Sequence, residues 1–274
     1  ILRDSNPGSV TLTPGGVGRN IAHDLCLLGL DVSLVSAVGD DSNGEFLLGR
    51  CRGLGMDVSR VRVVPGARSS SYLYITDERG DMQLAVNDMA VCNEISPEYL
   101  ERVLPGIQAG ALVLDTNLPV ESLEFICRSS CIPLYADPVS SVKAMKLRSV
   151  MKHLRAIKPN ALEAAALTGQ TDPELAARAL IDEGVQRVFI SLGTNGMIAA
   201  EGSRILRMPS PEANVVNATG AGDAAMSAIV WADLHGLSLE DSARAAQLAG
   251  AITCASEESN APELSRLPGL LAAE

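Results

Sequence analysis

Short apolar runs alternate with longer segments of helical periodicity along most of the chain. Runs of this kind have the length of strands, whereas the helical patterns are long enough for helices. The alternation predicts βα units and a largely parallel sheet. Strands are predicted at 32–38, 111–115, 133–137, 154–158 and 187–193, with two more short ones at 196–201 and 204–208. Helices are predicted at 17–29, 42–54, 97–104, 119–130, 160–168, 173–183, 221–235, 239–256 and 263–273.

Residues 70–88 break this alternation, because they contain two strand-like runs joined by Asp77-Glu78-Arg79-Gly80. The Gly-bearing turn predicts a hairpin. We expect it to lie off the main sheet as a lid over the carboxyl ends of the parallel strands, where open α/β sheets bind ligands. An antiparallel extension of the sheet edge is the alternative. Without an internal repeat or linker, we expect one domain over 1–274, with a lid formed by about 8–14 and 68–90.

Composition and charge narrow the class of protein. Hydrophobic residues make up 47% and charged residues 20%, as in a folded globular protein. A net charge of −11 repels a phosphate backbone, so a nucleic-acid polymer is not an expected partner. No apolar run has the roughly 20 residues that cross a bilayer, and the first residues lack the pattern of a secretory signal. Scattered cysteines without a CxxC pair favour core thiols over zinc or disulfides, and hence the cytoplasm.

The stretch "NATGAGDAA" places small residues at the start of a predicted helix. The first N–H groups of a helix lack intrahelical partners and the macrodipole favours negative charge there, so Gly220, Ala221 and Gly222 can surround a phosphate. Asp223 at the rim can take a proton from an attacking hydroxyl. The alternative is that Thr219 or Asp223 only caps the helix.

A second glycine-rich stretch, "TPGGVGRN", precedes the first predicted helix. It does not match the GxGxxG spacing of a dinucleotide site. The adjacent Gly15 and Gly16 allow a ligand to approach the backbone, and Asn20 can offer both a donor and an acceptor to sugar hydroxyls. A glycine-rich turn with Asn20 as a local cap is the alternative.

Two further motifs suit a nucleotide. In "KPNALEAAALTG", Asn160 and Glu163 lie three apart on one helix face and can hold a hydrated Mg²⁺. Capping by Asn160 with a solvated Glu163 is the alternative. In "SLGTNG", Ser191 and Gly193 follow a buried strand and can border a nucleotide.

Along the chain the four motifs follow the order TPGGVGRN, KPNALE, SLGTNG and NATGAGD. In this order they resemble the ribokinase-like (PfkB) carbohydrate kinase family over essentially the whole chain. The resemblance implies a three-layer α/β/α sandwich with a mostly parallel sheet and a small β lid. It also implies transfer of the ATP γ-phosphate to a sugar or nucleoside hydroxyl, with Mg²⁺, a K⁺ site beside the anion-binding loop, and a homodimer formed through the lid.

The resemblance assigns expected roles to individual residues. Asp223 becomes the catalytic base beside an anion hole of Gly220, Ala221 and Gly222. The expected substrate contacts are Gly15, Gly16, Asn20 and Asn117, and the expected nucleotide contacts are Asn160, Glu163, Ser191, Gly193, Gly196 and Gln247, with Glu163 on Mg²⁺ through water.

Shorter segments resemble family members that phosphorylate the ribose 5′-hydroxyl of pseudouridine. They are "DSNPG" (4–8), "TPGGVGRN" (13–20), "SAVGDD" (36–41), "SSYL" (70–73), "AVNDM" (85–89) and "DPVS" with Lys143 downstream. We expect Asn87 and Asp88 on the lid to contact the uracil-like edge. Tyr72 and Tyr74 share a lid face and either contact the base or pack the lid onto the core.

One departure from the family pattern concerns the first strand, which in the family ends in an N-x-D motif that grips sugar hydroxyls. The sequence begins after that point, so this strand is missing from it: either the strand precedes Ile1 in the full protein, or the protein lacks it. Another sugar or nucleoside kinase, of the ribokinase or adenosine/inosine type, is the first alternative function. A non-catalytic ligand-binding protein of the same fold is the second.

Overall fold

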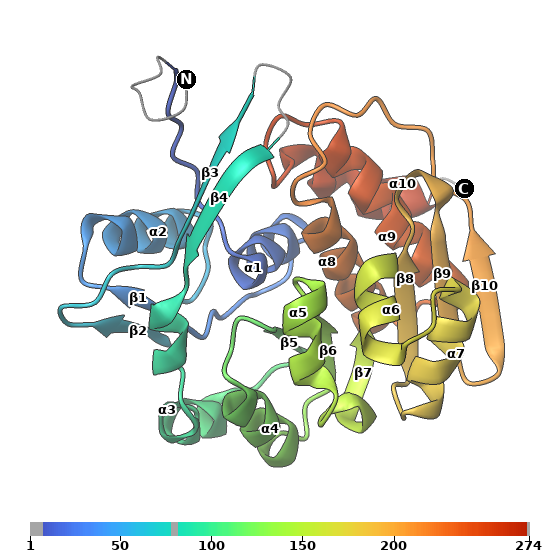
Figure 1. Cartoon of the computed structure of the whole chain (residues 1–274), viewed down its shortest axis with the longest axis horizontal. Helices are drawn as coiled ribbons and strands as arrows, with labels where there is room; N and C mark the ends of the chain where they lie inside the picture. The colour runs from blue at the N-terminus through green and yellow to red at the C-terminus, as the bar shows by residue number, and fades with distance from the viewer. Residues whose placement is uncertain (1–7, 78–81, 273–274) are drawn as a thin grey trace.

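A six-stranded sheet forms the centre of the molecule in the computed structural model, which describes residues 8–77 and 82–272 (Figure 1). Its order is β10-β9-β8-β7-β6-β5. Neighbours from β5 to β8 pair in parallel, whereas β9 and β10 are antiparallel, so the prediction of a largely parallel sheet is confirmed. The strands are β5 (Leu112–Asp115), β6 (Leu134–Asp137), β7 (Leu154–Ile157), β8 (Arg187–Ser191), β9 (Met197–Glu201) and β10 (Arg204–Met208).

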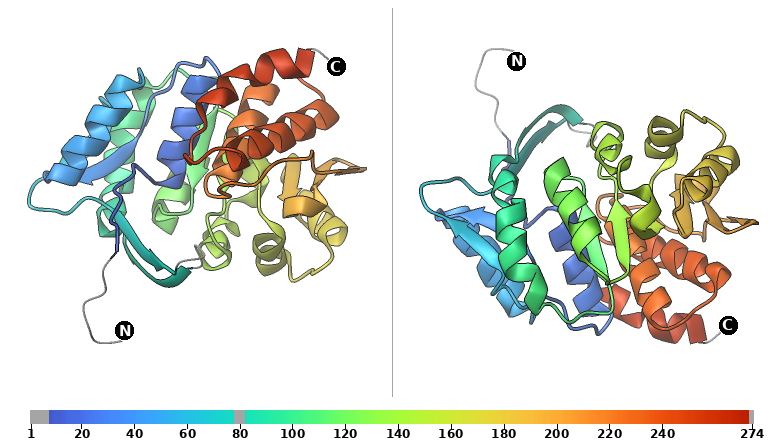
Figure 2. Two further views of the ribbon diagram at one scale, coloured as in Figure 1. Left: turned by 90° about the horizontal axis from the view of Figure 1, so that it is seen from above. Right: turned by 90° about the horizontal axis from the view of Figure 1, so that it is seen from below.

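Helices cover both faces of this sheet (Figure 2). Alternate residues of a strand point to opposite faces. Tyr135 and Phe189 accordingly pack with α1 (Val17–Leu27), α8 (Ala221–Leu234) and α9 (Leu239–Cys254). Ala136 and Ile190 belong to the core under the other helices, α3 (Pro97–Val103), α4 (Val120–Ser129), α6 (Ala161–Thr168) and α7 (Pro173–Asp182). The architecture is therefore the three-layer α/β/α sandwich that the sequence predicts.

Three further helices are described. They are α2 (Ser42–Gly53), α5 (Ser141–Ala144) and α10 (Leu267–Ala272), with short 3-10 turns at Ala90–Glu94, Leu104–Gly106, Met145–Leu147, Met151–His153, Gly193–Asn195 and Pro262–Arg266. The predicted helix at 263–273 is thus shorter, because Pro268 lacks an N–H and fits only the first turn of a helix. Within the described ranges, no helix is both long and apolar enough to span a bilayer. All six cysteines are free thiols.

One predicted core strand lies outside the six-stranded sheet. Of the run 32–38, only its end enters β1 (Ser36–Gly39), which pairs in parallel with β2 (Val61–Val64) as a separate two-stranded sheet. Ser33 makes only an isolated bridge. The pattern did not identify β2, because its four residues are partly exposed and include an arginine.

The hairpin of β3 (Ser71–Thr76) and β4 (Met82–Asp88) pairs with neither of the other sheets, so the edge-extension alternative is wrong. The predicted turn residues 78–80 lie outside the described residues. β3 is exposed on both faces. Residues 8–14 form no helix or strand. Whether this segment and the hairpin act together as a lid stays a prediction.

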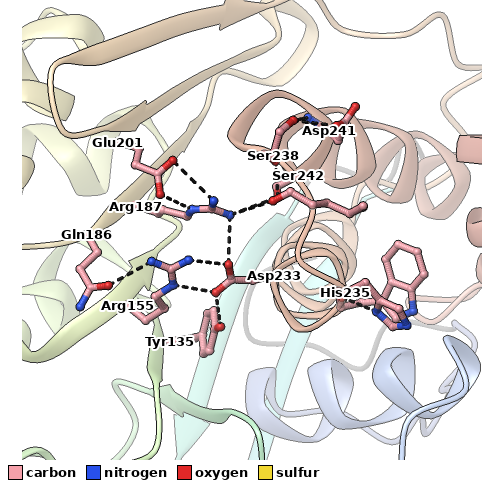
Figure 3. A network of polar contacts seen from close by, with 12 residues as sticks. Tyr135, Arg155, Gln186, Arg187, Glu201, Asp233, His235, Ser238, Asp241 and Ser242 are labelled. Carbon is pink, nitrogen blue, oxygen red and sulfur yellow. Dashed lines mark hydrogen bonds and ion pairs between the residues drawn. The ribbon is translucent and has the colours of Figure 1, made fainter.

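The amino ends of the parallel strands carry a dense polar network around the last turn of α8 (Figure 3). Asp233 accepts hydrogen bonds from Arg155 through both carboxylate oxygens at 2.7 Å, and from the hydroxyl of Tyr135 at 2.5 Å. Arg187 donates to Asp233 at 3.0 Å and to Glu201 at 2.7 Å. At this amino edge of the sheet, the charges of Arg155 and Arg187 are therefore paired with carboxylates.

Candidate active site

The opposite edge of the sheet carries a group of polar residues at the carboxyl ends of neighbouring strands. Asp115 ends β5, Asp137 ends β6, Lys158 directly follows β7 and Ser191 ends β8. Parallel strands bring these ends to one edge, where open α/β sheets bind ligands. A pocket of about 300 Å³ lies there, lined by Val17, Asp137, Val139, Lys158, Asn160, Glu163, Ser191, Gly222 and Asp223.

The N-terminus of α8 borders this pocket. Gly220 is the N-cap residue, with a φ of 86°, and no side chain of the described residues caps the helix. Capping by Thr219 or Asp223 is therefore not the role of this stretch. A Cβ on Gly220 would lie 2.0 Å from the carbonyl oxygen of Ser259, so both backbone conformation and space require glycine here. The first turn of α8 therefore has no side-chain cap among the described residues, and uncapped helix N-termini of this kind can bind anions.

Asp223 lies in this first turn and accepts a hydrogen bond from the Nδ2 of Asn20 at 2.7 Å. Burial, helped by the charges of Asp137 and Asp115, raises the pKa of Asp223 to about 7, against the opposing effects of Asn20 and Lys158. A carboxyl group with a pKa near the working pH is well suited to accept a proton from a hydroxyl.

Asn20 reaches Asp223 from α1, so the local-cap alternative for Asn20 is wrong. The N-cap of α1 is Gly16, with a φ of 97° and no side-chain cap among the described contacts. Neighbours hold Asn20 in place: Arg19 donates to its Oδ1, and Asn260 donates to its carbonyl oxygen at 3.0 Å.

The glycine-rich turn before α1 is tied to the sheet. The N–H of Gly18 donates to Asp115 Oδ2 at 3.0 Å, and a Cβ on Gly18 would lie 3.1 Å from that oxygen. The predicted contacts Gly15 and Gly16 lie at the start of this turn and are exposed. The backbone of Gly15 and Gly16 is therefore exposed to solvent beside the pocket, whereas Gly18 is held by its hydrogen bond to Asp115.

Asn160 and Glu163 form a capping box at the start of α6, each side chain accepting the other's N–H at 2.9 Å. The capping alternative is thus half right, since Glu163 is not solvated but only 6% exposed. Burial and the charge of Asp137 raise the pKa of Glu163, an effect that a bound cation would relieve. In the described part of the chain, no three His, Cys, Asp or Glu side chains could hold a metal. A site with few protein ligands fits Mg²⁺, which keeps its waters and binds phosphates.

The other predicted nucleotide contacts are distributed around the pocket. Ser191 lines it. Gly193 and Gly196 have φ values of 59° and 91° in the turn after β8, where left-handed backbone favours glycine. Gln247 on α9 donates from Nε2 to the carbonyl oxygen of Pro209 at 3.1 Å. These last three residues are not among the pocket-lining residues.

Of the remaining predicted substrate contacts, Asn117 lies just beyond β5, and those on the hairpin are not among the pocket-lining residues. Lys143 Nζ donates to Asn117 Oδ1 at 2.6 Å, which joins the loops that follow β5 and β6. Asn87 and Asp88 are exposed on β4 and do not line the pocket.

Five residues of the site are absent from the sequence-based prediction: Val17, Asp115, Asp137, Val139 and Lys158. Three of them had a signal, because "LVLD", "LYAD" and "LRAIK" each end an apolar run in a charged residue. A charge at the carboxyl end of a buried parallel strand indicates a ligand site.

The fold and the site together define a three-layer α/β enzyme, with an open helix N-terminus beside a buried carboxylate at the carboxyl edge of a parallel sheet. A comparison with family models matches residues 3–266 to the pfkB family carbohydrate kinases. The chain belongs to this family and is a carbohydrate kinase of the PfkB type, a family that acts on small sugar or nucleoside substrates.

Individual relatives are similar over nearly the whole chain. Pseudouridine kinase of Escherichia coli is 38% identical over 270 residues, covering 96% of this chain and 86% of its own. An uncharacterised sugar kinase of the same organism, YeiI, is 37% identical over 95% of this chain and 74% of its own. A solved Escherichia coli structure, described as a candidate ribokinase II in complex with ATP and Mg²⁺, is 18% identical with a TM-score of 0.83, covering 100% of this chain and 94% of its own.

Proposed function

We propose that the protein phosphorylates the ribose 5′-hydroxyl of pseudouridine with ATP, giving pseudouridine 5′-phosphate. The observation that carries the mechanism is the placement of Asp223: a carboxyl group with a pKa of about 7 in the open first turn of α8. The observation that favours this substrate is the 38% identity to a pseudouridine kinase over nearly the whole chain.

In the proposed reaction, Asp223 accepts the proton of the 5′-hydroxyl as its oxygen attacks the γ-phosphorus of ATP. The N–H groups of Gly220, Ala221 and Gly222 stabilise the charge on the transferring phosphoryl group. Asn20 holds the carboxylate of Asp223 at 2.7 Å and so fixes the direction from which the hydroxyl is approached. When bound, Mg²⁺ neutralises phosphate charge, and Glu163 and Asn160 are the residues we assign to it through water.

The nucleoside is proposed to lie over the turn before α1, against Gly15, Gly16 and Asn20. Asn117 and Lys143 present an amide and an ammonium group at the same edge of the sheet, and together these can meet the donors and acceptors of a uracil-like ring. Asn87 and Asp88 would reach the base only from the lid. Tyr72 and Tyr74 lie on the same lid face as Asn87, with ring centroids 5.8 Å apart and about half of each residue exposed.

ATP is proposed to lie along Asn160, Glu163 and Ser191, with its base toward Gly193, Gly196 and Gln247. Use of ATP as donor is the basis on which we assign the reaction to the cytoplasm. The family resemblance extends the proposal to a K⁺ ion beside the anion-binding loop, which kinase activity in K⁺ against Na⁺ buffers would test.

A homodimer through the lid is also part of the proposal. Leu73, Ile75, Leu84 and Val86 share the second face of the hairpin and are each more than half exposed. Four aliphatic side chains on one strand pair form an apolar face that a second copy of the hairpin would cover. Sedimentation of the wild type and of Leu73→Glu tests this: a dimer that becomes a monomer supports the arrangement, and an unchanged mass contradicts it.

The substrate is tested by ADP release with pseudouridine, uridine, adenosine, inosine, ribose and fructose as acceptors. We expect the highest kcat/KM for pseudouridine. A clear preference for ribose or for a purine nucleoside would support the alternative of another PfkB-family sugar or nucleoside kinase, which the 37% identity to an uncharacterised sugar kinase also favours. Tight nucleoside binding without ADP release would support a non-catalytic relative.

A further inference from the structure

Lys158 is a buried cation in the wall of the pocket, and the mechanism above does not use it. Lys158 is only 4% exposed, and its Nζ lies 3.3 Å from Asp137 Oδ2. A Cβ placed on Gly222 would lie 3.4 Å from the same Nζ. The ammonium group therefore sits between the end of β6 and the first turn of α8, directly beside the anion hole.

A structural role does not account for this placement. An ammonium group has three donors, and among the described residues only Asp137 is seen to pair with it. The positive end of the α8 macrodipole disfavours a cation at this point, and burying a charge is costly unless it is well paired. An anion bound at the start of α8 would supply the missing partner.

The surrounding charges keep Lys158 protonated. Burial alone would lower the pKa of its ammonium group, but the charges of Asp137, Glu163 and Asp223 outweigh burial and hold the pKa above its ordinary value. The group is therefore a fixed positive charge over the whole range of pH in which Asp223 titrates.

The backbone beside Asp137 is strained in a way that fixes its carboxylate. Val139 has a φ of 63°, which is unfavourable for a β-branched residue and is found where the surroundings enforce it. In this conformation the N–H of Val139 donates to Asp137 Oδ1 at 2.8 Å. Oδ1 of Asp137 therefore accepts the N–H of Val139, and Oδ2 of Asp137 faces the ammonium group of Lys158.

We propose that Lys158 is a catalytic residue whose ammonium group binds a non-bridging oxygen of the γ-phosphoryl group, and that Asp137 is a positioning residue that holds it. This inference rests on the proposed kinase function. In the step, the 5′-oxygen gives its proton to Asp223 and forms a bond to phosphorus. The bond from phosphorus to the bridging oxygen breaks, and ADP leaves with the electron pair. Lys158 keeps its proton and stabilises the charge that moves.

The test compares Lys158→Met with the wild type and with Lys152→Met, an exposed lysine on the far side of the sheet, as matched control. We expect kcat to fall about 10²- to 10³-fold in Lys158→Met. We also expect calorimetry to show at least about tenfold weaker binding of a non-hydrolysable ATP analogue, with ADP affinity nearly unchanged, because only the analogue carries a γ-phosphate. The control variant should match the wild type in all three measurements.

Asp137→Asn provides a second test that does not require Lys158→Met to fold. The charge of Asp137 raises the pKa of Asp223. Its removal should therefore move the acidic limb of the pH profile of kcat to lower pH while kcat itself falls. If Asp137 also holds Lys158 in place, Asp137→Asn should lose affinity for the non-hydrolysable ATP analogue with ADP affinity nearly unchanged, as Lys158→Met does.

Different results would overturn different claims. A wild type that phosphorylates no nucleoside or sugar contradicts the proposed function itself. An active wild type with near-normal kcat in Lys158→Met, or with equal losses of affinity for ADP and the analogue, contradicts the role of Lys158 and leaves the proposed function in place. Unchanged affinity of Asp137→Asn for the ATP analogue contradicts the positioning role.

Discussion

Helix α8 carries one aspartate at each end, and their environments differ in an instructive way. Asp223 in the first turn has one hydrogen-bonded side-chain partner among the described residues, Asn20, and other carboxylates nearby, and its pKa is raised to about 7. Burial would also raise the pKa of Asp233 in the last turn, but hydrogen bonds from Arg155 and Tyr135 and the charges of two arginines outweigh it and lower that pKa (Figure 3).

The helix macrodipole alone predicts the opposite order. It stabilises a carboxylate at the N-terminus and destabilises one at the C-terminus, by about 0.3–1 kcal/mol each. Each hydrogen bond to a charged group contributes about 1.5–3 kcal/mol, so the number of donors decides. A buried carboxylate with many donors is a structural element, and one with few donors retains the ability to exchange a proton.

The largest expected effect separates the two aspartates by activity. Asp223→Asn removes the proton acceptor but keeps the shape of the side chain, and we expect kcat to fall at least about a thousandfold with ATP affinity little changed. Asp233→Asn should keep kcat within a fewfold in the folded fraction. Steady-state kinetics and calorimetry on both variants measure this. Near-normal turnover in Asp223→Asn would refute the assigned base.

The second-largest expected effect is a difference in stability between variants of the two aspartates. Asp233→Asn leaves Arg155 and Arg187 with a neutral partner, so we expect the free energy of unfolding to fall by about 3 kcal/mol. Asp223→Asn should not lower it. Urea denaturation at pH 7 compares the two. An equal loss in both variants would mean that Asp223 is held as firmly as Asp233.

The smallest effect is the pH dependence of stability, and it has opposite signs at the two ends of α8. The pKa of Asp223 is higher in the folded chain than its ordinary value of 3.8, so its contribution to wild-type stability is lost as pH rises toward about 7. Asp223→Asn should therefore gain in Tm relative to wild type over this window. The pKa of Asp233 is lowered, so the penalty of Asp233→Asn should shrink as pH falls below 4. Melting curves at several pH values measure both trends.

The sequence predicts the sheet and its helices well, because runs such as 111–115 and 187–193 are apolar throughout and bounded by clear turns. It predicts β2 and α5 poorly, because elements of four residues carry too little periodicity to be distinguished from loops. The motifs also identify Asp223 and Asn20, but not that they touch across 203 positions of the chain. Such contacts depend on how α1 and α8 pack together.

The same limit applies to the charges of the site. The pattern places Asp137 and Lys158 at the ends of predicted strands, but their pairing depends on β6 and β7 being neighbours. The strained turn at Val139 has no signal in composition or periodicity. The sequence identifies the motifs. It does not give the distances between their side chains, which depend on how the strands and helices pack around the pocket.

The central claim is that Asp223 serves as the base because its environment raises its pKa. The most direct measurement is kcat for pseudouridine against pH from 5 to 9, at saturating ATP and Mg²⁺, in the wild type and in Asp223→Asn. The account predicts that wild-type kcat rises about tenfold per pH unit and levels off near pH 7, and that the residual activity of the variant lacks this limb. A wild-type profile that is flat over this range, or an identical limb in the variant, would contradict it.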